Sequence, residues 1–89
     1  MQDKIITVIM SGFPAHYPVY ITDEEGPSVG TSIAYDLLPG YVSATANQHH
    51  INHIKLCGNK ELSFQLAENI TTIAKTEYSN NNLEIEVIE

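Results

Sequence analysis

Three of the four histidines in this 89-residue chain fall within five residues, at His49, His50 and His53. Neutral imidazole binds zinc, copper and nickel, so this spacing first suggests a metal site. On an extended strand, however, His49 and His53 would share one face while His50 pointed to the other. The chain also has no Cys-x-x-Cys pair to complete a ligand set. We therefore predict no metal site and no cofactor.

The same segment suits a binding surface better than a metal. Residues 47–53 are polar apart from Ile51, and we expect them to form a hairpin that exposes amide and imidazole groups to a protein or small-molecule ligand. Histidine titrates near neutral pH, so such binding would depend on pH. We expect the proline-rich segment 11–27 to complete the surface, because long loops often carry sites. The predicted binding residues are His16, Tyr17, Ser28, Asn47, Gln48, His49, His50, Asn52 and His53.

Two other motifs are weaker candidates for chemistry. The run 26–32 would open a helix with backbone N–H groups and hydroxyls, as a phosphate cradle does, but it lacks the lysine of a P-loop. Cys57 lies where a strand is expected to give way to a helix, a position that can lower the pKa of a thiol. No base is expected beside Cys57, which favours a buried apolar role. The sequence therefore indicates no reaction type.

The charge balance narrows the class of partner. Eleven acidic residues face four lysines, arginine is absent, and the net charge is −7. A nucleic-acid-binding protein needs a basic surface, so we predict no direct contact with nucleic acid or with an anionic membrane. An acidic surface is compatible with a basic protein partner. The single cysteine, and the absence of a basic segment before the first apolar run, predict a cytoplasmic location.

The elements that position these residues follow from hydrophobic periodicity. A continuous apolar run indicates a central strand, and alternation of apolar residues with Glu84 and Glu86 indicates a half-exposed one. Asn59 is a suitable N-cap for the longest helix, and Pro39 and Gly40 are expected to end the first. We predict strands at 4–10, 41–46, 54–57 and 83–88, and helices at 28–38 and 60–78.

This order predicts a single α+β domain over residues 1–89 with the ferredoxin-like split β-α-β arrangement (β-α-β-β-α-β). Its sheet would be antiparallel, with both helices on one face and an additional edge strand at 18–22 as a variant. Because the strand at 4–10 is apolar towards both faces, something should cover the second face. Either the segment 11–27 or a second copy of the chain would do so, and a homo-oligomer is expected.

Taken together, the sequence favours a small acidic binding or regulatory module. Its contact surface would be the central hairpin and the 11–27 loop, and its partner a protein or a small ligand. The alternative is a small oligomeric enzyme, or a protein that sequesters a small molecule, with its pocket between subunits.

Overall fold

The structure is a computed structural model that describes residues 4–10, 15–23, 26–27 and 30–88. The chain forms an α+β domain with one mixed sheet and two helices, as the sequence predicts at the level of fold class. Its elements are β1 (Ile5–Ile9), β2 (His16–Asp23), β3 (Gly26–Pro27), β4 (Thr31–Ala34), the 3₁₀ turn η1 (Tyr35–Leu37), α1 (Leu38–His49), β5 (His53–Cys57), α2 (Lys60–Tyr78) and β6 (Glu84–Ile88).

The strand order differs from the predicted ferredoxin-like one. The two short strands β3 and β4 pair with different parts of the same edge of β2, so the sheet has five positions in the order β3/β4, β2, β1, β5, β6. β1, β5 and β6 run parallel to one another, whereas β2 is antiparallel to β1. The strand expected at 18–22 exists within β2, but it is an interior strand because β1 and β3/β4 flank it.

The region around Pro39 departs most from the sequence prediction. In place of a helix at 28–38 and a strand at 41–46, the structure has β4, then η1, then α1. Pro39 lies in the first turn of α1. The N–H that proline lacks would have no intrahelical partner there, and its fixed φ suits the helix. This proline therefore begins a helix, whereas the sequence was expected to end one at this point.

Small residues let α1 pack closely on α2. Leu38, Val42 and Ala46 are buried and recur every four residues, which is helical spacing. Between them Ser43 is also buried; its Oγ donates to the carbonyl of Pro39 at 2.6 Å and lies 3.3 Å from the carbonyl of Ile70 on α2. The weak alternation of residues 41–46 thus reflects a tight helix–helix contact and not a strand.

The helix α2 confirms the prediction made for it. The Asn59 side chain accepts a hydrogen bond from the backbone N–H of Leu62 at 3.1 Å, which caps the first turn. Leu66, Ile70 and Ala74 form the buried stripe against the sheet. In the part of the chain that the structure describes, no helix is long and apolar enough to cross a bilayer.

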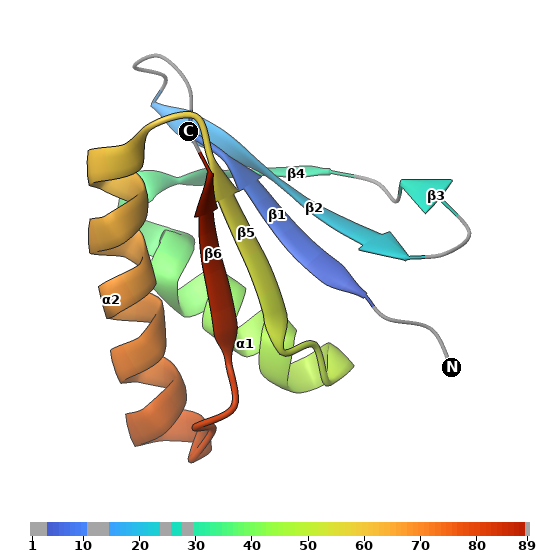
Figure 1. Ribbon diagram of the computed structural model, residues 1–89, viewed down its shortest axis with the longest axis vertical. Helices are drawn as coiled ribbons and strands as arrows, with labels where there is room; N and C mark the ends of the chain where they lie inside the picture. The colour runs from blue at the N-terminus through green and yellow to red at the C-terminus, as the bar shows by residue number, and fades with distance from the viewer. Residues whose placement is uncertain (1–3, 11–14, 24–25, 28–29, 89) are drawn as a thin grey trace.

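The two faces of the sheet are covered differently. Figure 1 shows α1 and α2 on one face, with the strands seen from the other. Ile6 and Val8 are fully buried under the helices, whereas Ile5 and Thr7 are half-buried on the opposite face and Ile9 is 36% exposed. β2 lies beside β1 and not across it. Within the described residues, the first strand is therefore buried on one side only.

Candidate functional site

A polar hollow of about 250 Å³ lies at the end of the sheet where both helices finish and where β5 and β6 begin. Four of the eight residues around it are asparagines, and none is a lysine, an arginine or a carboxylate. The hollow therefore presents amide and hydroxyl groups without a fixed charge. Its lining residues are Ala46, Asn47, His50, Asn52, Tyr78, Ser79, Asn80 and Asn82.

Both helices end at this hollow with a residue in the left-handed conformation. His50 follows α1 with φ of 57°, and Ser79 follows α2 with φ of 52°. Among the described residues, these two are the only non-glycine residues with positive φ. The left-handed conformation costs a non-glycine residue roughly 1–2 kcal/mol, and glycine is the usual occupant. Histidine and serine at these positions bring side chains to the hollow that glycine would lack.

Asparagine contacts tie the two connections around the hollow together. Asn80 Nδ2 donates to Asn52 Oδ1 at 3.4 Å, and the backbone N–H of Asn82 donates to Asn80 Oδ1 at 2.9 Å. The backbone N–H of Glu84 donates to the carbonyl of Asn52 at 2.7 Å. The segment after α2 is thus held against the segment before β5 beside the hollow.

The helix ends give the hollow a negative character without a carboxylate. The last carbonyls of a helix lack intrahelical partners and carry the negative end of the helix dipole, equivalent to roughly half a charge. Two such ends meet at this hollow, and asparagine oxygens add further acceptors. The net charge of −7 acts in the same direction. The hollow therefore suits a cation or a group rich in N–H donors, and it disfavours phosphate.

The structure brings three of the predicted binding residues together at the hollow, Asn47, His50 and Asn52. The hairpin expected at 47–53 is wrong, because α1 continues to His49 and only residues 50–52 connect it to β5. Gln48 and His49 are exposed in the last turn of α1 and do not line the hollow.

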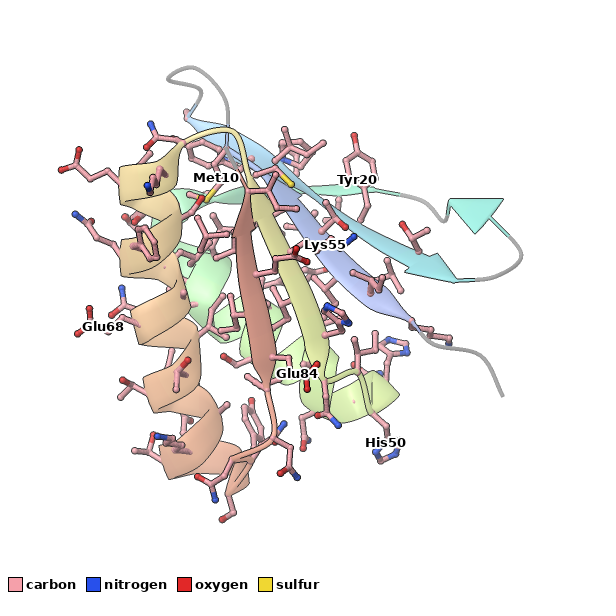
Figure 2. The ribbon with its side chains drawn as sticks, in the orientation of Figure 1. Met10, Tyr20, His50, Lys55, Glu68 and Glu84 are labelled. Atoms are coloured by element: carbon pink, nitrogen blue, oxygen red, sulfur yellow. The ribbon has the colours of Figure 1, made fainter. Side chains whose placement is uncertain are left out.

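His53 belongs to a different surface. It begins β5, and its Nε2 lies 4.0 Å from Glu86 Oε1 on β6. Its neighbour Ile54 faces the helices, since successive residues of a strand face opposite sides, and Asn52, which precedes β5, lines the polar hollow. Figure 2 shows His50 at the end of α1, whereas Lys55 and Glu84 lie on the helix-free face of the sheet with His53. His50 and His53 therefore cannot act as one contact group.

His16 and the central segment of the predicted surface lie at opposite ends of the sheet. His16 begins β2, six residues before Thr22, and Thr22 pairs with Ile5 beside His53. At about 3.3 Å per residue, His16 is roughly 20 Å from the level of His53 along the strands. His16 therefore does not form a continuous surface with the central segment, although Thr22, at the other end of β2, lies level with His53.

Tyr17 and the 26–32 motif also have structural surroundings that the sequence did not predict. Tyr17 is buried in the core, 5% exposed, and its ring meets that of Tyr35 edge-on at 5.9 Å between centroids. Ser28 lies outside the described residues. Gly30 precedes β4 and not a helix, and a Cβ at this position would overlap the Tyr20 ring.

Sequence reasoning missed the C-terminal half of the hollow. Tyr78, Ser79, Asn80 and Asn82 belong to a segment that the sequence marks only as the end of a helix. The run of three asparagines at 80–82 was the available signal, because its amides can serve a site as well as stop a helix. The structure groups no three histidine, cysteine, aspartate or glutamate residues at metal-binding distances among those it describes.

A second, larger hollow of about 600 Å³ lies between the start of α1 and the middle of α2. Leu37, Tyr41 and Ile73 make it mostly apolar, with Asp36 and Asn69 also in its lining. Leu37 is 65% exposed. This hollow has fewer groups that could orient a ligand than the polar hollow, and we therefore take the polar hollow as the candidate site.

The sequence matches no protein-family model, and no curated protein is similar enough to count as a relative. The function is therefore argued from the geometry of the site.

Proposed function

We propose that this protein is a non-catalytic binding module whose polar hollow receives a cationic, donor-rich side chain of a protein partner. The observation that carries the proposal is the convergence of two helix C-termini and four asparagines on one hollow. Acceptors there are preorganised, so a guanidinium or ammonium group would replace water without rearranging the walls.

The size of the hollow favours a side chain over a whole cofactor. Pockets for drug-sized ligands usually occupy about 300–1,000 Å³. The polar hollow, at about 250 Å³, falls below that range. An arginine side chain offers five N–H donors in a planar fork and matches a ring of amide and carbonyl oxygens.

The setting of the module is also part of the proposal. A net charge of −7 would attract a basic partner over distances of about one Debye length, roughly 8 Å at physiological salt. We place the module in the cytoplasm because its single cysteine suits a reducing compartment. Assembly into a homo-oligomer stays a prediction, and native mass spectrometry at micromolar protein concentration would test it.

The proposal can be tested by NMR titration with N-acetyl-arginine methylamide. We expect shifts of the side-chain amide signals of Asn47, Asn52, Asn80 and Asn82, with N-acetyl-glutamate methylamide as the acidic control. Asn47→Ala should weaken binding at least threefold, because a lining side chain is lost. It should leave thermal stability unchanged, because no described hydrogen bond involves the Asn47 side chain. Gln48→Ala is the matched control, because Gln48 is the next residue of α1 and does not line the hollow.

Two results would overturn the proposal. Equal shifts with the arginine and glutamate compounds would show that the hollow does not select a cation. Shifts confined to residues outside the hollow would place the binding site elsewhere on the protein.

A further inference from the structure

The strand β6 forms one edge of the sheet and pairs only with β5 among the described strands. The N–H of Glu84 and the carbonyl of Ile88 both bond towards the β5 side. Because alternate residues of a strand direct their backbone groups to opposite sides, those of Ile85 and Val87 point outward. The outer edge of β6 therefore offers N–H and C=O groups for another strand.

A groove runs beside this edge on the helix side, and three of its six lining residues are apolar. It has a volume of about 430 Å³ and is lined by Ala67, Glu68, Thr71, Thr72, Leu83 and Ile85. Phe64 shares a stripe of α2 with Ala67 and Thr71, three and seven residues further on, and is 55% exposed. A strand added to β6 could bury apolar side chains there on every second residue.

The opposite side of the edge is acidic. Glu84 and Glu86 are exposed on the helix-free face, and Figure 2 shows Glu84 on that face. An antiparallel pairing of β6 with β6 of a second copy would bring these carboxylates near their counterparts, which is destabilising. A strand with basic residues at the same positions would meet opposite charges instead.

We propose that β6 accepts an extended segment of a partner protein in which basic and apolar residues alternate. The backbone of the segment bonds to the outward groups of Ile85 and Val87, its apolar side chains enter the groove beside Phe64 and Ala67, and its lysines or arginines lie opposite Glu84 and Glu86. The inference does not rest on the polar hollow, because none of these groups lines it.

The test uses the peptide acetyl-Thr-Lys-Val-Lys-Val-Lys-Thr-amide and the whole protein. Hydrogen exchange measured by NMR should slow at least tenfold at the amides of Ile85 and Val87 on binding. It should change little at Glu86, whose N–H already faces β5. The same peptide with glutamates in place of lysines is the control and should produce no protection.

Two pairs of variants separate the backbone and charge contributions. Val87→Pro removes an outward N–H without removing a bond to β5, and should weaken binding more than tenfold, while Val87→Ala keeps that N–H and serves as its control. Glu86→Lys should raise the Kd for the lysine peptide about fivefold and favour the glutamate peptide. Glu77→Lys makes the same charge change at an exposed residue of α2 that does not line the groove, and should have a smaller effect.

Several outcomes would overturn the inference. One is binding of the lysine peptide with no added protection at Ile85 and Val87, and another is undiminished binding by Glu86→Lys. If these two amides are already protected in a dimer of the free protein, the occupant of the edge is a second copy. Loss of arginine binding by Asn47→Ala with normal peptide protection at β6 would separate this inference from the proposed function.

Discussion

The two faces of the sheet are built from alternate residues of the same strands, yet they have different roles. On β5, Ile54 and Leu56 are fully buried beneath the helices, while His53 and Lys55 are half-exposed on the other face. The covered face contributes most of the stability, because burial of apolar area is the main favourable term in folding. The helix-free face, the β6 edge and the helix ends carry the polar groups available for contact.

This difference separates residues that can be changed to test function from those that cannot. Substitutions on the helix-free face should leave the fold intact, so any loss of binding there can be assigned to contact. Four predictions measure how sharply the two faces differ, beginning with the largest expected effect.

The first prediction compares neighbours on β5. Leu56→Ala should lower the free energy of unfolding by about 3 kcal/mol, because it leaves a cavity in a fully buried site. Lys55→Ala, one residue away on the other face, should change it by less than about 0.5 kcal/mol. Urea denaturation followed by circular dichroism measures both. Similar losses for the two variants would show that the helix-free face is also covered.

The second prediction concerns Tyr35 on the covered side. Its hydroxyl is buried without a hydrogen-bond partner among the described residues, so Tyr35→Phe should raise the free energy of unfolding by about 1 kcal/mol. Burial, followed by the neighbouring Tyr17, raises the pKa of Tyr35 above its ordinary value of 10.0. Tyr20→Phe, on the opposite face, is the control for loss of a hydroxyl.

The raised pKa of Tyr35 also fixes the direction of its pH dependence. The folded state holds the phenol proton more tightly than the unfolded state. The protonated phenol therefore makes its full contribution to the free energy of unfolding below pH 10. It should be lost as the pH rises from about 10 through the folded pKa. Thermal melts between pH 8 and pH 11 should show a smaller alkaline loss for Tyr35→Phe than for the unchanged protein.

The third prediction separates stability from binding at the polar hollow. His50→Gly relieves a left-handed non-glycine residue but adds flexibility to the unfolded chain, so the net gain should be about 0.5 kcal/mol. Binding of N-acetyl-arginine methylamide should weaken because a lining side chain is lost. If the variant is more stable and binds the arginine compound as tightly as the unchanged protein does, His50 does not contribute to the site.

The smallest effect is expected for the pair between His53 and Glu86. Both side chains are about half-exposed, and His53 Nε2 lies 4.0 Å from Glu86 Oε1, a geometry that contributes little in water. His53→Ala should change the free energy of unfolding by less than about 0.5 kcal/mol at pH 6 and at pH 8. A larger change at pH 6 would mean that the helix-free face holds this pair away from solvent.

Local patterns were sufficient for α2, β1, β5 and β6. The strand β1 follows from a continuous apolar run, and the other three from a clear period of apolar residues, with the Asn59 cap as a further boundary signal for α2. The helix end predicted at Pro39 is wrong because proline is common both in the first turn of a helix and just after its last turn. The residues next to Pro39 do not distinguish the two positions. The strand predicted at 41–46 is wrong because the small side chains there fit the close packing of α1 on α2. That packing cannot be recognised from the local sequence.

The candidate site was predictable only in part. Asn47, His50 and Asn52 stand out by composition, but their partners Asn80 and Asn82 are about thirty residues away and reach them through β6. His16 and Tyr17 were grouped with them because the 11–27 segment was expected to be a long loop that carries a site, whereas both residues belong to β2.

The sequence by itself determined the fold class, the longest helix and its cap, and the acidic character of the protein, because each depends on residues close together or on composition alone. Only the tertiary structure decided that β1 and β5 are parallel neighbours, that both helices end at one hollow, and that β6 is an edge. Strand order is set by the packing of distant apolar faces against each other. No short stretch of the chain contains that information.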